Sequence, residues 1–185
     1  MGKIIIITAP SGSGKTSLVK KMLQTYPELS FSVSACTREK REKEIDGKDY
    51  YFLPVDKFKE CIKKDEFVEW EIVYEGKYYG TFKSEFERIW EDNKIPIVDI
   101  DVKGALDIKE KYPNSITIFI KVPLQLLRKR LEDRGTDTQK SIEERVNKAS
   151  KEAEQENKFD LIILNENFDL AVEKLQEKII DYLND

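Results

Sequence analysis

Four consecutive isoleucines, Ile4–Ile7, stand directly before the stretch TAPSGSGKTSL, and this junction constrains the fold more than any other part of the chain. A short, continuous β-branched run is typical of a strand buried on both faces, as in a parallel sheet. Beyond the Gly-Lys-Thr, apolar residues recur at helical spacing at Leu18, Val19, Met22 and Leu23. The glycine-rich stretch therefore joins a buried strand to the N-terminus of an amphipathic helix.

The spacing Ala9-x-x-x-x-Gly14-Lys15-Thr16 fits the phosphate-binding P-loop, with Ala9 where the strict pattern has glycine. Gly12 and Gly14 have no Cβ, so backbone N–H groups can curl round a phosphate, and the helix N-terminus adds its dipole. Lys15 supplies a charge for the β- and γ-phosphates, and Thr16 supplies a hydroxyl for Mg²⁺. A coincidental Gly-Lys-Thr in an ordinary turn is the alternative, but the flanking strand and helix favour a nucleoside triphosphate site.

The composition of the chain excludes several classes of function. The chain has 185 residues, which suits one domain with insertions. Its net charge is −4, with 37% charged residues of both signs, and this argues against general affinity for nucleic acid. It has no histidine, and Cys36 and Cys61 lack a metal-like spacing, so zinc sites and Ser-His or Cys-His catalysis are excluded. There is no signal-peptide pattern and no apolar run near 18 residues, so we expect a cytoplasmic protein with reduced thiols and no membrane association.

Apolar strand-like runs alternate with amphipathic helical segments along the chain, which predicts an α/β fold with a parallel five-stranded core sheet covered by helices. The last helix carries one apolar stripe, which runs through Phe168, Val172, Leu175, Ile179 and Tyr182. The expected strands are Ile4–Thr8, Ile95–Ile100, Ile116–Val122 and Leu161–Leu164, with Phe31–Ala35 as a weaker fifth.

Two stretches interrupt this alternation. Residues 36–81 contain a charged segment, a short helix over Val55–Lys64 and then alternating strands, which predicts a small mixed α/β insertion. In these strands Val68, Trp70 and Ile72 share one face, and Glu69 and Glu71 the other. Residues 125–155 are helical, highly charged and bent at a glycine, Gly135. Their later half has only a narrow apolar stripe of Ile142, Val146, Ala149 and Ala153, which favours a mobile helical lid over a site.

Both insertions carry arginines. An isolated arginine is usually solvated surface charge, but these groups flank the expected mouth of the P-loop. Moving a phosphoryl group between two phosphates brings like charges together. Each pair of like unit charges at ~4 Å costs on the order of 4 kcal/mol at an effective dielectric of ~20, and several arginines would offset this repulsion. An acceptor phosphate with a second pKa near ~6 is already anionic and needs no general base, whereas a hydroxyl acceptor usually does. The arginines are Arg38 and Arg41 in the first insertion and Arg128, Arg130, Arg134 and Arg145 in the second.

Two aspartates, Asp99 and Asp101, stand at the C-terminal end of the strand predicted over Ile95–Ile100. Ligands of open α/β sheets bind at the carboxyl ends of strands, and the alternation with Val98 puts both carboxylates on one side. An acidic residue here can hold a Mg²⁺-bound water. For Asp101 the alternative is the N-cap of the following helix.

The order of these features resembles the guanylate kinase family. The matching stretches are APSGSGKTSL, FSVSACTREKREKEIDGKDYYFL, FVEWEIVYEGKYYGT, IVDIDVKGA, RLEDRGTDT and LILNENFD, which together span nearly the whole chain. The resemblance implies a P-loop nucleoside-monophosphate-kinase fold. It also implies the reaction, the transfer of the ATP γ-phosphate to GMP, and to dGMP, with Mg²⁺. It implies a P-loop core (1–35, 82–124 and 156–185), a GMP-binding domain (36–81) and a lid (125–155). ATP and GMP are the implied partners, and the chain is expected to be a monomer or homodimer.

The resemblance also implies roles for individual residues around GMP. Two arginines and a tyrosine would hold the phosphate, and a glutamate with two hydroxyl side chains would face the guanine. The phosphate set is Arg38, Arg41 and Tyr50, the guanine set is Glu69, Ser34 and Thr81, and Tyr79 and Asp101 complete the GMP-binding residues.

On the donor side, the resemblance places ATP on the P-loop, with the metal near Thr16 and Asp99 and the adenine between Arg134 and the loop of Asn165. Lid arginines would close on the phosphates. The implied ATP-binding set is Ala9, Pro10, Ser11, Gly12, Ser13, Gly14, Lys15, Thr16, Ser17, Arg134 and Asn165, and the implied catalytic set is Lys15, Arg38, Arg41, Arg130, Arg134 and Arg145.

The chain departs from the family pattern at a few positions. Lys40 and Lys43 replace the usual proline and glycine of the loop around the first two arginines, Lys103 stands where glutamine is common, and Thr81 replaces a common serine but keeps the hydroxyl. None of these changes removes a group that the chemistry needs.

Base chemistry favours guanine independently. Guanine presents N1–H and N2–H₂ donors on its Watson–Crick edge, and a carboxylate such as Glu69 accepts both, whereas adenine has an acceptor at N1. Two alternatives stay open. One is a non-catalytic guanylate-kinase-like interaction module, which would lose the P-loop and lid chemistry that is present here. The other is a kinase for AMP or a pyrimidine monophosphate, against which Glu69 and Ser34 argue.

Overall fold

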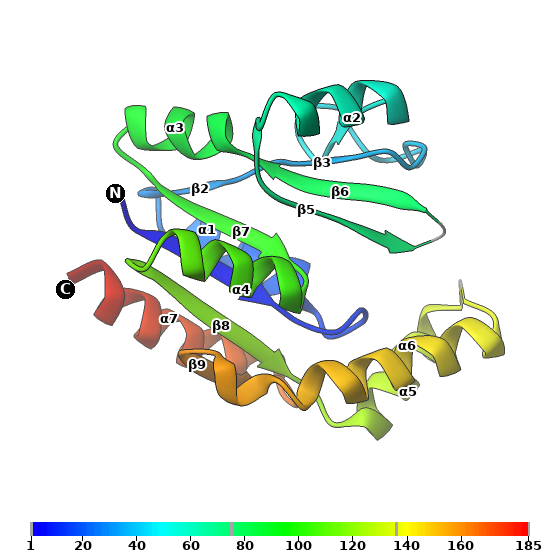
Figure 1. The fold of residues 1–185 in the computed structure, drawn as a ribbon. Coiled ribbons are helices and arrows are strands. Elements are labelled where there is room, and N and C mark those ends of the chain that lie inside the picture. Colours follow the sequence, from blue (N-terminus) through cyan, green and yellow to red (C-terminus); the bar gives the residue numbers. More distant parts are fainter. Residues whose placement is uncertain (1, 75, 136, 185) are drawn as a thin grey trace.

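The core of the fold is a five-stranded, fully parallel sheet with the strand order β2-β7-β1-β8-β9 (Figure 1). The structure is a computed structural model that describes residues 2–74, 76–135 and 137–184. The α/β P-loop fold expected from the sequence is confirmed. The core strands are β1 (Ile4–Thr8), β2 (Leu29–Phe31), β7 (Ile95–Ile100), β8 (Ser115–Lys121) and β9 (Leu161–Leu164).

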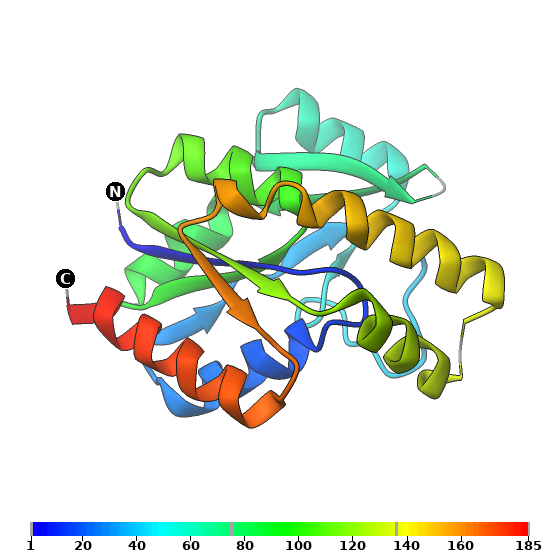
Figure 2. The same ribbon diagram turned by 90° about the horizontal axis from the view of Figure 1, so that it is seen from below.

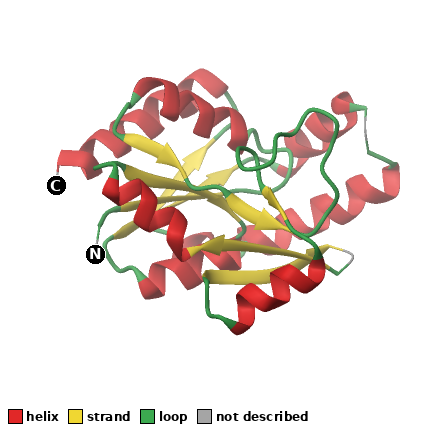
Figure 3. Cartoon of the chain, turned by 90° about the horizontal axis from the view of Figure 1, so that it is seen from above, coloured by secondary structure: helices red, strands yellow, loops and turns green. Residues whose placement is uncertain are grey.

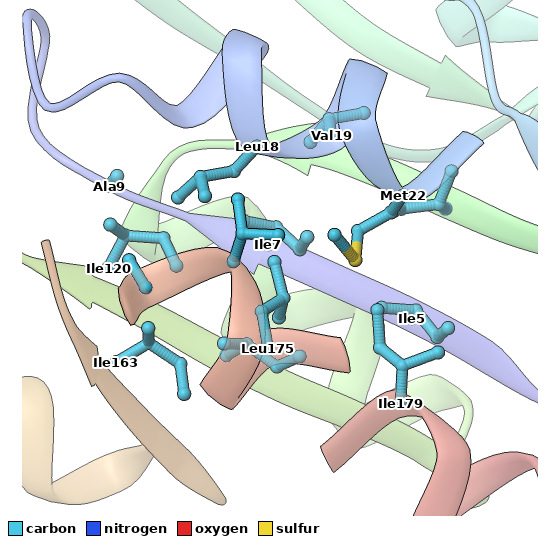
Figure 4. Close-up of a cluster of buried hydrophobic side chains, with 14 of the residues drawn as sticks. Ile5, Ile7, Ala9, Leu18, Val19, Met22, Ile120, Ile163, Leu175 and Ile179 are labelled. Atoms are coloured by element: carbon cyan, nitrogen blue, oxygen red, sulfur yellow. The ribbon is translucent and has the colours of Figure 1, made fainter. Parts of the chain in front are cut away.

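The isoleucine run is buried on both faces of this sheet, and all four side chains have 0% exposure. Ile5 and Ile7 pack under α1 (Lys15–Thr25) and α7 (Phe168–Asn184), as Figure 4 shows for the contacts with Leu18, Met22, Leu175 and Ile179. Ile4 and Ile6 pack on the opposite face, against α3 (Lys83–Glu91) and α4 (Val102–Lys111). Figure 2 shows α1 and α7 side by side below the sheet. The helices of both faces fix the carboxyl end of β1, from which the glycine-rich loop leaves.

A second, smaller sheet lies above the core sheet in the view of Figure 1, and Figure 3 looks down on it. Its strand order is β4-β3-β6-β5, and its pairing is mixed. Phe58 of α2 (Val55–Lys63) stacks on Phe67 with the ring centroids 4.4 Å apart, and Phe67 stacks on Phe82 at 4.5 Å. This aromatic stack gives the second sheet a core of its own. The strands are β3 (Ser34–Cys36), β4 (Tyr51–Phe52), β5 (Phe67–Tyr74) and β6 (Lys77–Phe82).

A helical hairpin of α5 (Leu124–Arg134) and α6 (Gln139–Ala153) extends from the core beside the glycine-rich loop (Figures 1 and 2). Gly135 ends α5 with φ at 67°, in the left-handed region that glycine adopts without steric cost. The narrow apolar stripe of α6 is buried against α5 in a separate cluster. A short 3-10 turn, η1 (Glu156–Lys158), then returns the chain to β9. The cluster consists of Val122, Leu127, Leu131, Ile142, Val146 and Ala149, with Leu126 packed against it.

The fifth core strand differs from its prediction. Phe31–Ala35 is not one strand, because the chain leaves the core sheet after Phe31 and joins the second sheet at Ser34. The Ser32 amide still bonds the Ile97 carbonyl at 3.1 Å, but the Val33 amide donates to a side-chain carboxylate, that of Glu85, at 2.8 Å. A long-range hydrogen bond therefore divides a stretch that alternates like a single strand.

Three apolar residues that the sequence grouped with buried neighbours are exposed. Val68 is buried, but Trp70 and Ile72, further along β5, are 42% and 50% exposed. Phe168, at the first turn of α7, is 40% exposed. Two further predicted elements differ from the structure by a single residue at their ends: β8 runs from Ser115 to Lys121 and α2 ends at Lys63.

No helix within the described ranges is long and apolar enough to cross a membrane.

Candidate active site

The glycine-rich loop forms a cradle at the carboxyl end of β1. The Ser13 amide bonds the Pro10 carbonyl at 3.1 Å, which closes the loop on itself. Gly12 and Gly14 have φ of 90° and 86°, a conformation that L-residues with a side chain rarely adopt. No described side chain caps the first turn of α1 at Gly14. The Ser17 amide bonds the Gly14 carbonyl at 3.1 Å, and the N–H groups at the very start of the helix, with the helix dipole, can bind an anion.

The lysine of this loop reaches across to the neighbouring strand. Lys15 Nζ lies 2.5 Å from Asp99 Oδ1 and donates to the Ile100 carbonyl at 3.2 Å. Asp101 caps α4 instead, because its carboxylate accepts from the Gly104 amide at 2.9 Å. The N-cap interpretation of Asp101 is thus confirmed, while Asp99 faces the phosphate cradle.

A cleft of about 680 Å³ lies between the glycine-rich loop, the second sheet and the helical hairpin. It brings together almost all of the residues that the sequence singled out, from segments as distant in the chain as the glycine-rich loop and α6. Two residues of the implied ATP- and GMP-binding sets do not line the cleft: Thr81, which is fully buried, and Asn165, which is 1% exposed. The predicted residues that line the cleft are Ala9, Pro10, Ser11, Gly12, Ser13, Gly14, Lys15, Thr16, Ser17, Ser34, Arg38, Arg41, Tyr50, Glu69, Tyr79, Asp99, Asp101, Arg130, Arg134 and Arg145.

At the end of the cleft formed by the second sheet, a buried carboxylate faces inward. Glu69 is 8% exposed and accepts a hydrogen bond from the Thr81 hydroxyl at 2.7 Å. A Cβ added at Gly104 would lie 3.0 Å from Glu69 Oε2, so this glycine leaves room for the carboxylate. Burial raises the pKa of Glu69 to about 7, the bond from Thr81 opposes the shift, and the nearby Asp101 adds to it. Thr81 acts on this end of the cleft through Glu69.

An arginine is held rigidly on one wall. Both terminal nitrogens of Arg38 lie 2.6 Å from the Glu44 carboxylate oxygens, a bidentate pair, and the guanidinium stacks 4.9 Å from the Tyr50 ring centre and 5.3 Å from that of Phe52. The bond from Arg38 lowers the pKa of Glu44 to about 2. The Arg41 amide also donates to Glu44, at 2.9 Å. The role of Glu44 was not predicted, because a carboxylate six positions after an arginine is not a recognisable signal in the sequence.

Tyrosines complete this wall. Tyr50 meets Tyr79 edge to face with the ring centres 6.1 Å apart. Burial raises the pKa of Tyr50 to about 12, and the nearby carboxylate of Asp99 adds to the shift. The phenol of Tyr50 is therefore protonated at neutral pH and is available as a hydrogen-bond donor.

The helical hairpin contributes cations from the opposite wall. Arg130 donates to the Asn165 carbonyl at 3.0 Å and to the Ser13 carbonyl at 3.4 Å, and Asn165 itself donates to Ser13 at 2.6 Å. Arg145 contacts the Ser11 hydroxyl and lies 3.2 Å from Asp137. Both arginines thus already touch the glycine-rich loop.

Arg128 has a different role from the cleft arginines. It forms a bidentate pair with Glu143 of α6 on the exposed side of the hairpin and does not line the cleft. It ties the two helices of the hairpin together.

Three charged residues that line the cleft were not predicted from the sequence: Glu71, Lys148 and Glu152. Lys148 lies 3.6 Å from Glu152, and burial raises the pKa of that glutamate although Lys148 opposes the shift. Lys148 and Glu152 follow Arg145 on α6 by three and seven positions, which places all three on one face of the helix. That spacing is the signal that could have identified Lys148 and Glu152.

Comparisons with known proteins agree with this geometry. A family model described as guanylate kinase matches residues 1–182. The guanylate kinase of Porphyromonas gingivalis is 44% identical and matches 99% of this chain and 99% of its own length. That of Salinibacter ruber is 38% identical over 98% of this chain and 97% of its length.

Solved structures show the same relationship. The crystal structure of guanylate kinase from Anaplasma phagocytophilum superposes with a TM-score of 0.76 at 26% identity, covering 99% of this chain and 85% of that one. A shikimate kinase from Bacteroides thetaiotaomicron, at 16% identity and a TM-score of 0.51, shares the fold alone. The family model and the full-length curated relatives together show that this chain belongs to the guanylate kinase family.

Proposed function

We propose that this chain is an ATP:GMP phosphotransferase, which transfers the γ-phosphate of ATP to GMP and gives ADP and GDP. The single observation that carries the proposal is the pairing of a P-loop with Glu69 in one cleft. The P-loop is a triphosphate site, and a buried carboxylate is matched to the N1–H and N2–H₂ donors of guanine. The curated relatives are named guanylate kinases, which supports the same reaction.

Charge stabilisation and positioning supply the catalysis in this proposal. Arg38, Arg41 and Tyr50 hold the phosphate of GMP, and Lys15 holds the phosphates of ATP. Arg130, Arg134 and Arg145 approach from the hairpin as the charge develops. No general base is needed, because the acceptor phosphate is already anionic at neutral pH.

The donor side fits Mg²⁺. Proteins bind this ion through one or two carboxylates together with waters and substrate phosphates, not through a full protein cage. The hydroxyl of Thr16 and the carboxylate of Asp99 both line the cleft, and the described residues contain no cluster of three or more metal-ligating side chains. Thr16 and Asp99 would hold the ion, which neutralises charge on the β- and γ-phosphates when bound.

Three further assignments belong to the proposal. The first is the division into a P-loop core, a GMP-binding domain over 36–81 and a lid over 125–155. The second is the adenine site, with Arg134 and the Asn165 loop as its walls. The third is a place in cytoplasmic purine nucleotide metabolism, with dGMP as an additional acceptor.

An ADP-release assay with a panel of acceptors tests the reaction. We expect ATP-dependent ADP formation with GMP and dGMP, and little with AMP, CMP or UMP. Equal rates with AMP would indicate a different nucleoside-monophosphate kinase. GMP binding without ADP formation would indicate the non-catalytic interaction module.

A further inference from the structure

A buried carboxylate outside the cleft joins the two sheets. Glu85 lies on α3 and is 3% exposed, yet it touches neither of the proposed substrates' sites. Its two oxygens accept four hydrogen bonds, from the Val33 amide at 2.8 Å, the Tyr51 hydroxyl at 2.9 Å, and two nitrogens of Arg88 at 3.1 and 3.0 Å. A buried charge with its hydrogen bonds satisfied in this way holds its partners in one geometry.

The position of Glu85 in the topology is specific. The chain passes from the core sheet to the second sheet between β2 and β3, and it returns through α3 between β6 and β7 (Figure 1). Val33 lies in the first crossing and Glu85 in the second. One hydrogen bond therefore links both covalent connections between the two sheets, at the place where any rotation between them would occur.

The helix that carries Glu85 is anchored in the core. The next residue, Phe86, has 0% exposure and packs with Ile4, Ile6 and Val98 between the sheet and α4. The carboxylate thus projects from a fixed part of the core toward the second sheet. Burial on its own would raise the pKa of Glu85, but the bonds from Arg88, Val33 and Tyr51 together hold the pKa below its usual value, so the group is ionised at neutral pH.

Val33 in the first crossing and Tyr51 in β4 each stand beside a cleft residue. Val33 precedes Ser34, which lines the cleft and pairs with Thr81 across β3 and β6. Tyr51 follows Tyr50, which lines the cleft and stacks on Arg38. A displacement of either partner would move the acceptor site relative to the P-loop.

We infer that Glu85 is a positioning residue for the acceptor nucleotide, which sets the orientation of the second sheet against the P-loop core by its bonds to Val33 and Tyr51. The inference rests on the proposed function, because it takes the second sheet as the GMP-binding side of the cleft. The inference predicts an effect on one substrate only. The donor site lies wholly on the core and hairpin, so Glu85 acts on GMP alone.

Three variants and a matched control test this role. Glu85→Ala removes all four bonds. Glu85→Gln keeps an oxygen for the Val33 amide, and its NH₂ can donate to the Tyr51 hydroxyl oxygen. That NH₂ also meets the N–H of Arg88 Nε, so the variant is conservative toward the second sheet and loses part of the bond to Arg88. Tyr51→Phe removes only the link to β4. Glu91→Ala removes an exposed carboxylate from the same helix.

We expect Glu85→Ala to raise the KM for GMP about tenfold, with the KM for ATP changed less than about twofold, because a misplacement remote from the reacting atoms weakens one half-site only. Glu85→Gln and Tyr51→Phe should each raise the KM for GMP about two- to threefold, and Glu91→Ala should match the parent. If Glu85→Ala does not fold, Glu85→Gln and Tyr51→Phe decide the outcome by the same comparison of the KM for GMP with the KM for ATP.

Two results would overturn the inference. One is an unchanged KM for GMP in a folded Glu85→Ala, or in both milder variants. The other is an equal rise in KM for both substrates, which indicates a general loss of structure. A parent protein that does not phosphorylate GMP contradicts the proposed function as well, so the parent assay distinguishes the two failures.

Discussion

Lys15 Nζ of the glycine-rich loop lies 2.5 Å from Asp99 Oδ1 at the end of the adjacent strand. The ion pair joins the first residue of α1 to β7, the strand beside β1 in the sheet, although Lys15 and its second contact, Ile100, are 85 positions apart in the chain. It holds the lysine at the mouth of the phosphate cradle and keeps the aspartate beside it. The charge that a triphosphate would meet is thus oriented before any nucleotide arrives.

Removal of that charge should stop catalysis without unfolding the chain. Lys15→Ala should lower kcat by ~10²-fold or more, because transition-state charge on the transferring phosphoryl group loses its nearest cation. Thermal unfolding should change little, since the lysine is partly exposed. Steady-state kinetics with ATP and GMP measures the effect, and Lys20→Ala, an exposed lysine on the same helix, is the control. Near-normal turnover of Lys15→Ala would show that this loop is not the donor site.

The choice of acceptor should depend on Glu69. Glu69→Gln presents NH₂ in place of one oxygen, so one contact with guanine becomes donor against donor. This mismatch should cost ~1–3 kcal/mol, roughly ten- to a hundredfold in kcat/KM for GMP. The KM for ATP should scarcely move, and activity with AMP should fall less or even rise.

Steady-state kinetics of Glu69→Gln with GMP, IMP and AMP tests this prediction. IMP is the informative comparison, because it keeps N1–H and lacks the N2 amine. Unchanged GMP kinetics would mean that other residues recognise the guanine.

The pKa of Glu69 predicts a pH dependence of GMP recognition. Burial raises this pKa to about 7, and only the ionised carboxylate accepts both donors of guanine. As pH falls below about 7, kcat/KM for GMP should therefore fall by up to about tenfold per pH unit, while the KM for ATP stays constant. Glu69→Gln lacks the titrating group, so its profile should keep only the ionisation of the GMP phosphate near ~6. Identical profiles for parent and variant would contradict the assignment.

Stability should change with pH in the opposite direction. The folded-state pKa of Glu69 lies above the ordinary value of 4.5, so the folded chain retains a proton that the unfolded chain has lost. Between about 4.5 and about 7, ionisation of this group therefore costs stability as pH rises. Relative to Glu69→Gln, the parent should gain unfolding free energy as pH is lowered through this window. Chemical denaturation at several pH values measures the difference, and a constant difference would argue against the raised pKa.

Glu44 should act on GMP through Arg38. In Glu44→Gln an NH₂ group faces a guanidinium, so the bidentate pair is lost and the arginine leaves its fixed position. We expect the KM for GMP to rise about tenfold, with little change for ATP. The pKa of Glu44, lowered to about 2, keeps the pair intact throughout the assay range. Glu42→Gln, an exposed change in the same loop, is the control, and equal kinetics in both variants would show that Arg38 is positioned by other contacts.

The helical hairpin should become protected when both nucleotides bind. It packs through its own small cluster, and its contacts with the P-loop are made by Arg130, Arg145 and the leucine Leu131 against Gly12, so it can move as a unit when these few contacts change. Hydrogen exchange over residues 125–155 should slow with an ATP analogue plus GMP, and less with either alone. Exchange that does not change in that segment would count against a closing lid.

Local patterns in the sequence determined the core sheet and the phosphate cradle. The isoleucine run, the glycines and the helical spacing after Lys15 are contiguous, so hydrophobic periodicity and backbone conformation predicted β1, the loop and α1 correctly. The arginine-bearing hairpin was predictable for the same reason, since Gly135 and the stripe of α6 are local features.

Only the tertiary structure decided which side chains hold the site together. Phe31–Ala35 alternates like one strand, and it divides because Glu85, 52 positions beyond Val33, accepts that residue's amide hydrogen. Glu44 gains its role by closing on Arg38, and a register shift between Phe67 and Glu69 interrupts the alternation of β5. Such contacts depend on hydrogen-bond partners that are distant in sequence or on strand register, and neither leaves a periodic signal in the chain.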